Sequence, residues 1–427
     1  MKKIGIAALL IIITSISLKA QLNLNAEIRP RGEVRNGYKS MFSEDDNTAY
    51  FVSQRTRLGL SYNHEKYELK ITGQDVRVWG DESIYSSTGV KGDAASLELY
   101  EAWFGLNIGQ YSQIKVGRQE WKYDDQRLLA NRNWGQSGMA YDGLVFKYNN
   151  KGFRADIGLS LNNDSENKVG NEYTPDKMKF LDFVYLNKKL GDKSVITFTG
   201  ILSGYQKEEG SETIYVTATY GPYFKIKNKF LEAEASAFHQ SGTNIKGQKV
   251  NAYLISVKGF YKFSNQFKLG PGVDIISGND LSSTSNKDNS FDVLYGGRHR
   301  FLGDMDYFTN LTKSSSDAGI IDIYAKANFG INAKSSINFA YHHFSTQKSI
   351  PDPNNLTSDL KKALGNEFDM MYKYKAEIPA ELRIGMSFFS ANESMEILQG
   401  VTDNVNNLQY FMWIQIAFSP RIFNSEN

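Results

Sequence analysis

Hydrophobic and polar residues alternate with a period of two along most of this sequence. In residues 22–31, LNLNAEIRPR, the even-numbered residues from Leu22 to Ile28 are apolar and the odd-numbered residues between them are polar. The same alternation runs through KFLEAEASAF at 229–238, IIDIYAKANF at 320–329 and NEFDMMYKYK at 366–375. Side chains of a strand point alternately to its two faces, so the pattern predicts strands with one apolar and one polar face.

Eighteen segments of this kind can be counted. They begin near residues 22, 50, 66, 95, 112, 138, 152, 177, 193, 212, 228, 248, 265, 317, 334, 365, 380 and 407. Short connections, near 63–66, 108–112, 149–151, 190–193, 226–228, 330–334 and 376–380, alternate with long ones, of which the longest runs from 277 to 317. Such alternation is typical of an up-and-down barrel with tight turns on one rim and long loops on the other.

A soluble β-sandwich is the alternative, because its strands also have one apolar and one polar face. The even, high strand count and the length of many segments favour a membrane barrel, since soluble strands average about five or six residues. The 25 Tyr and 26 Phe residues also suit the aromatic girdles of outer-membrane barrels. We therefore predict an all-β fold, a transmembrane antiparallel up-and-down β-barrel of about 18 strands, with long external loops and short periplasmic turns.

The N-terminal residues indicate where the protein is located. Residues 1–20, MKKIGIAALLIIITSISLKA, have a basic start, a short apolar core and a small residue at the end, which predicts a signal peptide followed by a barrel domain at 21–427. An anchor helix is the alternative, but the apolar core is short for a span of about 20 residues.

Removing Lys2, Lys3 and Lys19 with the signal peptide changes the formal charge from +2 to −1. A nearly neutral chain predicts no nucleic-acid partner, and the absence of cysteine excludes a disulfide framework.

Several motifs resemble a known family. They are FVSQRTRLGLSY at 51–62, GRQEWKYDDQRLLANRNWGQSGMAYDG at 117–143, FDVLYGGRHRFLGDMDYF at 291–308, and LGNEFDMMYKYK at 364–375 with the later ESMEILQG. The chain looks like a member of the alginate export family, and closest to its branch in Bacteroidetes-type bacteria. The resemblance implies an eighteen-stranded outer-membrane barrel that passes a polyanion or a small solute. A departure is the tail SPRIFNSEN after the last strand, since many outer-membrane proteins end on an aromatic residue.

Four arginines are the main candidates for the pore wall. Arg29 and Arg31 lie on the polar face of the first segment, and Arg55 and Arg57 on that of the second. Neighbouring strands pair in such a barrel, so these residues are expected to form one patch facing the lumen. The planar guanidinium group matches carboxylates well, and a uronate polymer carries one carboxylate per sugar. Alternatively, the arginines pair with acids such as Glu27 and only brace the wall.

The stretch 117–143 is expected to be a loop that joins two strands, with residues 122–137 as the third long external connection. If it folds inward, Arg118, Arg127 and Arg132 would face passing solute, and Trp134 or Trp121 would offer a surface on which a sugar ring could stack. In the alternative, the loop packs on itself and its aspartates pair with those arginines.

No catalytic, cofactor-binding or metal site is predicted. Asp124 and Asp125 are adjacent and would point apart in an extended chain, whereas a glycosidase needs two facing carboxyls. His342 and His343 would likewise lie on opposite faces of a strand. The loops at 45–50 and 279–289 carry oxygen ligands for calcium but lack the spacing of an EF-hand.

The sequence thus predicts a passive outer-membrane channel for an anionic solute, with an alginate-like polysaccharide as the first choice. A general or anion-preferring porin for small solutes, a structural or adhesin-like closed barrel and a lumen-sited enzyme are the alternatives. The expected partners are outer-membrane lipid, an anionic polysaccharide or small anion, and periplasmic export proteins.

Overall fold

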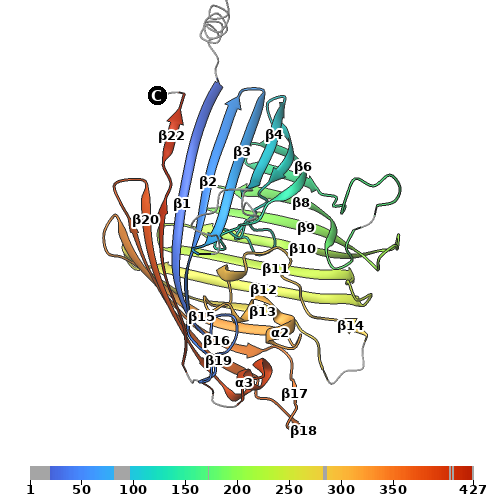
Figure 1. Cartoon of the computed structure of the whole chain (residues 1–427), viewed down its shortest axis with the longest axis vertical. Coiled ribbons are helices and arrows are strands. Elements are labelled where there is room, and N and C mark those ends of the chain that lie inside the picture. The colour runs from blue at the N-terminus through green and yellow to red at the C-terminus, as the bar shows by residue number, and fades with distance from the viewer. Residues whose placement is uncertain are drawn as a thin grey trace, which may run out of the picture.

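The wall of the molecule is a single antiparallel β-barrel (Figure 1). The computed structural model describes residues 20–80, 97–171, 173–281, 286–402, 405 and 408–425. Residues 1–19 of the signal peptide predicted at 1–20, and residues 282–285 of the loop at 279–289, therefore lie outside the described residues. The wall strands are β1 (Ala20–Asn36), β2 (Ala49–His64), β3 (Tyr67–Val78), β4 (Glu98–Ile108), β5 (Ser112–Gln119), β6 (Tyr141–Asn150), β7 (Phe153–Leu159), β8 (Met178–Leu190), β9 (Ser194–Gln206), β10 (Ile214–Lys227), β11 (Leu231–Thr243), β12 (Lys249–Lys262), β13 (Phe267–Ile276), β15 (Ile320–Gly330), β16 (Ser335–Thr346), β19 (Ala363–Lys375), β20 (Ala380–Ala391) and β21 (Gln409–Phe418). Shorter elements are β14 (Lys287–Asp288), β17 (Pro351–Asp352), β18 (Asn355–Asp359), β22 (Arg421–Asn424), η1 (Arg298–Arg300), η2 (Tyr307–Thr309), α2 (Leu311–Ser314) and α3 (Glu393–Gln399).

Each wall strand pairs with the next one along the chain, and β21 pairs with β1 to close the barrel. The predicted eighteen-stranded barrel is therefore confirmed, and each expected start lies within three residues of an observed strand start. None of the helices in the described part of the chain is long and apolar enough to cross a membrane.

The connections at the two rims differ as the sequence predicted. One rim carries tight turns such as 65–66 and 191–193, and we call it the short-turn rim; the start of β1 and β22 lie there. The other, the long-loop rim, carries the long connections. Two of these matter most below: the third loop (residues 120–140) and the seventh loop (residues 277–319).

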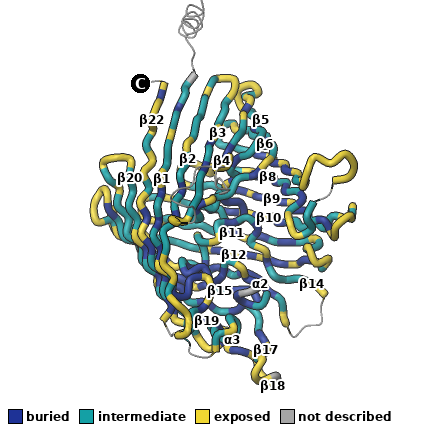
Figure 2. The backbone as a smooth tube through the Cα atoms, viewed as in Figure 1, coloured by how far each residue is buried: buried dark blue, intermediate teal, exposed yellow. Residues whose placement is uncertain are grey.

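Alternation along the strands separates an apolar outside from a polar inside. In β9, Thr197 and Thr199 are buried, whereas Ile196 and Phe198 are exposed on the outer face. Figure 2 shows the same change from buried to exposed along many strands. An outward apolar band is what lipid requires, and a closed sheet leaves no unpaired backbone within it.

The tail after the last wall strand has a structural role. Because β1 extends past the end of β21 at the short-turn rim, part of its edge would otherwise be unpaired. β22 fills this place by pairing with Asn23–Asn25 of β1. The departure from the usual terminal aromatic residue is thus explained by a longer first strand.

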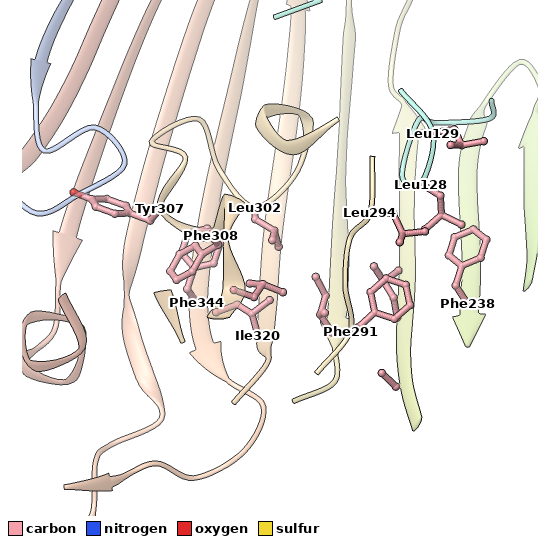
Figure 3. Close-up of a cluster of buried hydrophobic side chains, with 14 of the residues drawn as sticks. Leu128, Leu129, Phe238, Phe291, Leu294, Leu302, Tyr307, Phe308, Ile320 and Phe344 are labelled. Carbon is pink, nitrogen blue, oxygen red and sulfur yellow. The ribbon is translucent and has the colours of Figure 1, made fainter. Parts of the chain in front are cut away.

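The third and seventh loops fold into the barrel and bring a hydrophobic core with them (Figure 3). Leu128 and Leu129 of the third loop, together with Phe291 and Leu294 of the seventh, are buried in one cluster. Phe308 packs against Phe344 of β16, with ring centroids 4.5 Å apart. Since burial of each such side chain contributes about 1.5–3 kcal/mol, the loops are held firmly inside the lumen.

Candidate functional site

Two cavities inside the barrel define the candidate pathway. The long-loop cavity, of about 350 Å³, lies between the seventh loop and the long-loop ends of β9 to β12. The short-turn cavity, of about 1360 Å³, reaches from both inward loops to the turn at 375–380. Arg298 and Thr309 line both cavities, so we call this pair the constriction. A solute that crosses the barrel through these cavities passes Arg298.

The four predicted wall arginines lie together. Arg29 is directly opposite Arg55 in the pairing of β1 with β2, and Arg57 is opposite Glu27. Arg29, Arg31 and Arg55 are buried on the inner side of the wall. The predicted juxtaposition is therefore confirmed, although no observation shows that these residues contact a solute.

All four of these arginines bind the third loop directly. Arg29 donates through Nε and Nη2 to Oε1 of Gln136, and through Nη1 to the carbonyl oxygen of Asn133 at 2.7 Å. Nη1 of Arg55 and Nη1 of Arg57 both donate to Oδ1 of Asn133, at 3.0 and 3.1 Å. Charged hydrogen bonds of this kind each contribute about 1.5–3 kcal/mol, so the arginines fix the loop to the wall.

The arginines also have acidic partners. Arg55 forms an ion pair with Glu27 at 2.6 Å, as the bracing alternative expected. Arg31 pairs with Glu33 at 2.7 Å and donates to the carbonyl oxygen of Trp134 at 2.8 Å. The arrangement thus combines positive charge in the wall with a structural role for each guanidinium.

Arg127 is buried at the tip of the third loop. Its Nη1 and Nη2 donate to the two carboxylate oxygens of Asp274 in β13 at 2.9 and 3.0 Å, and Nη2 also donates to Ser256. Burial disfavours the charged form, but Asp274 and Asp125 outweigh it and raise the pKa of Arg127. This geometry makes Arg127 an anchor of the loop. The expectation that it faces passing solute is not what the structure shows, because Nη1 and Nη2 are both bonded to the wall and the side chain is buried.

Asp124 and Asp125 engage different parts of the wall. Asp124 accepts hydrogen bonds from the hydroxyls of Tyr185 and Thr197, at 2.8 and 2.7 Å. Asp125 accepts from the backbone N–H of Arg127 at 3.1 Å. Burial raises the pKa of Asp124 to about 6, with the two hydroxyls opposing the rise. The two carboxyls hold the loop, each through its own partners.

Arg132 connects the two inward loops. It donates through Nε to the carbonyl oxygen of Gly296 and through Nη2 to that of Leu294, both at 2.9 Å. A side chain at position 296 could not be accommodated, because its Cβ would lie 2.2 Å from the carbonyl oxygen of Arg127. Glycine here permits the close approach of the loops, and together they form one inward body.

Neither predicted tryptophan offers a free face. Trp134 stacks on His299 with ring centroids 3.7 Å apart, and the guanidinium of Arg31 lies 4.2 Å from the Trp134 ring centre. Trp121 is 1% exposed and stacks on Tyr141. The expected sugar-stacking surface is therefore occupied by protein groups.

Arg118 lies apart from the other candidates, and its predicted place at the pore mouth is wrong. Strand β5 continues to Gln119, so alternation fixes the direction of Arg118, which shares the outer face with Ile114 and Val116. There it pairs with Asp142 of β6 at 2.7 Å, with side-chain exposures of 41% for Arg118 and 63% for Asp142. The expectation placed residue 118 in a loop, whereas it belongs to the wall.

Arg298 is the functional residue that the sequence interpretation missed. It is exposed within the lumen, and no ion pair joins it to any described side chain. Burial and the nearby charge of Arg298 lower the pKa of Arg132, so the two guanidinium groups lie within electrostatic reach of each other. The signal was the triplet Arg298-His299-Arg300 within the long connection, two of whose members remain exposed.

His299 connects the seventh loop to its surroundings. Its Nδ1 lies 2.8 Å from Oδ1 of Asp306. The other carboxylate oxygen of Asp306, Oδ2, accepts a hydrogen bond from the hydroxyl of Tyr38. Burial disfavours protonation, but Asp306 and Asp304 outweigh it and raise the pKa of His299. The His299 ring, stacked on Trp134 and bonded to Asp306, thus fixes the loop beside the constriction.

The two adjacent histidines, His342 and His343, do not share a site. His342 is buried inside the barrel beside Asp322, while His343 bonds to Asn366 at 2.9 Å, so the two rings lie on opposite faces as predicted. Over the ranges that the structure describes, no three His, Cys, Asp or Glu side chains are grouped to hold a metal ion.

The architecture and the sequence agree on the class of protein. The sequence matches the alginate export family over residues 20–407, and the chain belongs to this family of outer-membrane β-barrels. Its location is the outer membrane, and its family and fold are those of transport channels. No curated protein is similar enough to be matched.

Solved structures share the fold at low sequence identity. OccAB1 of Acinetobacter baumannii is 12% identical with a TM-score of 0.64, and the match covers 94% of this chain and 97% of that one. OpdL of Pseudomonas aeruginosa is 10% identical with a TM-score of 0.62, covering 94% and 99%. OpdK of Pseudomonas aeruginosa, solved with vanillate, is 10% identical with a TM-score of 0.59, covering 94% and 98%. At these identities the likeness concerns the fold alone.

Proposed function

We propose that the protein is a passive channel for small solutes that carry a carboxylate. The observation that carries this proposal is the position of Arg298, an unpaired guanidinium at the constriction between the two cavities. Arginine presents a rigid fork that matches a carboxylate, and a solute that passes from one cavity to the other meets this group.

The charge of the short-turn cavity supports an anionic solute. Its basic lining residues outnumber its acidic ones: the bases are Arg29, Lys39, Arg132, Arg298, Arg300, Lys375 and Arg383, and the acids are Glu27, Asp304, Asp306 and Glu381. A cavity lined mostly by one sign of charge raises the local concentration of the opposite ion. In this proposal the arginines of β1 and β2 contribute charge to the wall while holding the third loop.

The inward loops favour a small solute over a polymer. They fill part of the lumen with a buried hydrophobic cluster, and Trp121 and Trp134 have no free face for a sugar ring. Vanillate, bound in the OpdK structure, is itself a small carboxylate.

An alginate-like polysaccharide is the second candidate, and the match to the alginate export family favours it. It would need the third or seventh loop to move away from the wall, since Arg29 and Arg127 hold the third loop in its present place.

Reversal potentials in planar bilayers test the first candidate. R298Q should lower the permeability ratio of acetate to sodium, because the unpaired positive charge is lost from the constriction. R118Q is the matched control, since Arg118 lies on the outer face. An unchanged ratio in R298Q, with the barrel still heat-modifiable on gels, would reject the proposal.

Uronate oligomers separate the two candidates. A polymer channel should show reversible, length-dependent block of ion current by oligomers, and R298Q should weaken it. A small-solute channel should show no block by long oligomers when acetate still permeates.

A further inference from the structure

The long-loop cavity presents both signs of charge at one place. Four aspartates line it, Asp176, Asp288, Asp292 and Asp317, together with two bases, Lys246 and Arg298. Its volume of about 350 Å³ falls within the usual size of small-molecule sites. This composition differs from that of the short-turn cavity, where bases are in excess.

The carboxylates of this cavity are positioned by neutral groups. Asp288 accepts hydrogen bonds from the side-chain amides of Asn244 and Asn279, at 2.7 and 3.0 Å. The backbone N–H of Asp292 donates to Oε1 of the buried Gln240, and Nε2 of Gln240 donates to the backbone carbonyl oxygen of Asp292, both at 2.8 Å. Among the described side chains, none forms an ion pair with either aspartate. No base among these side chains therefore neutralises either carboxylate, although backbone N–H groups of Leu294 and Ser290 donate to Asp292 and Asp288.

Asp292 and Arg298 both line the cavity, and no hydrogen bond or ion pair joins their side chains. Burial raises the pKa of Asp292, the charges of Arg298 and Arg132 oppose this rise, and the charge of Asp288 adds to it. The lining thus offers a group of each sign to a molecule that carries both complementary charges.

We infer that the long-loop cavity is a binding site for a small zwitterion with an ammonium and a carboxylate group, such as a free amino acid. The ammonium group donates its three hydrogens toward Asp288 and Asp292, and the carboxylate meets the fork of Arg298. Neutral polar groups, including Thr217 and Asn310, and apolar side chains such as Phe291 line the rest of the cavity. This inference rests on the proposed function, because it specifies the solute that passes Arg298.

Three solutes with one carbon skeleton provide the test. Tracer fluxes of alanine, propionate and propylammonium are measured in proteoliposomes containing the full-length protein. D292N removes a charged hydrogen-bond acceptor but keeps the shape, so the alanine-to-propionate flux ratio should fall on the order of tenfold. D288N should lower the same ratio independently. E44Q, on an exposed loop away from both cavities, is the matched control.

The outcomes distinguish this inference from the proposed function. If R298Q lowers propionate flux while D292N and D288N leave the alanine-to-propionate ratio unchanged, the zwitterion site is rejected and the carboxylate channel stands. If R298Q leaves propionate flux unchanged, the proposed function fails first. A fall in the ratio for D292N and D288N, but not for E44Q, supports the site.

Discussion

Arg127 of the third loop forms a two-point pair with Asp274 of β13, 147 residues further along the chain. Both side chains are buried, at 3% and 2% exposure. Removing one partner of such a pair leaves an uncompensated buried charge, at a cost of about 3–5 kcal/mol. We therefore expect R127A to release the tip of the third loop, which should appear as larger and noisier single-channel currents.

A double variant provides the control for this prediction. R127M–D274L replaces both charges by apolar groups of similar size, which is often neutral in stability. It should restore quiet currents and the wild-type temperature of the gel-mobility shift. If R127A alone behaves like the wild type, the pair does not hold the loop.

The arginines of β1 and β2 predict two effects that can be measured separately. R55Q–R57Q removes two positive charges from the wall and two hydrogen bonds to Asn133. The anion-to-cation permeability ratio should fall, and this effect should shrink at 1 M salt, where the Debye length is about 3 Å. Conductance should rise as the third loop loosens, and that effect should persist at high salt. R118Q should change neither quantity; a double variant with unchanged selectivity and conductance would contradict both roles.

Much of the fold could be predicted because lipid imposes a local rule. Every wall strand needs apolar side chains outside, so a period of two recurs wherever the chain crosses the membrane, and residues two apart carry the information. The adjacency of Arg29 and Arg55 followed in the same way, since sequential strands pair in an up-and-down barrel.

The inward loops could not be predicted by that rule. Their partners are far away in sequence, as for Arg29 with Gln136 and Arg132 with Leu294, and no local pattern indicates which groups meet. Arg118 shows that the predicted end of a strand decides which face a side chain is assigned to. Grouping Arg118 with the loop residues of 117–143 misplaced it, because it belongs to β5, where alternation directs its side chain to the outer face.

His299 gives the channel a pH dependence with a definite sign. Its pKa is raised above the usual value of about 6.5, mainly by Asp306 and Asp304 against the effect of burial and of Arg31. The charged pair with Asp306 is therefore fully formed below that usual value and is lost as the pH rises through the raised one. Open-channel noise should be low in mildly acidic buffer and increase in alkaline buffer, as the seventh loop loosens beside Trp134.

H299Q tests that assignment, since its amide does not titrate in this range. The variant should show noise that is independent of pH between mildly acidic and alkaline buffer. If H299Q keeps the wild-type pH response, another group is responsible.

The orientation of the barrel predicts which loops are accessible. With the start of β1 in the periplasm, the seventh loop lies outside the cell and the turn between β15 and β16 lies in the periplasm. A peptide tag inserted at Asn286 should be labelled by antibody on intact cells, and one at Asn332 only after the outer membrane is permeabilised. The reverse pattern would mean that the barrel is inserted with the opposite orientation.

The unequal charge of the two cavities predicts rectification. Aspartates are in excess in the long-loop cavity and bases in the short-turn cavity, so cations gather in the first and anions in the second. A positive potential on the long-loop side drives both kinds of ion toward the constriction, which raises conductance. The opposite polarity draws ions away from the constriction and lowers conductance.

The current should therefore be larger with the long-loop side positive in low salt. The orientation of the protein is established by one-sided addition of antibody to the Asn286 tag. Because screening is short-ranged at high salt, the asymmetry should vanish at 1 M, where the Debye length is about 3 Å. D288N–D292N should reduce it at low salt, while E44Q should not. Symmetric currents at low salt would show that the charges of the two cavities do not act along the path of the ions.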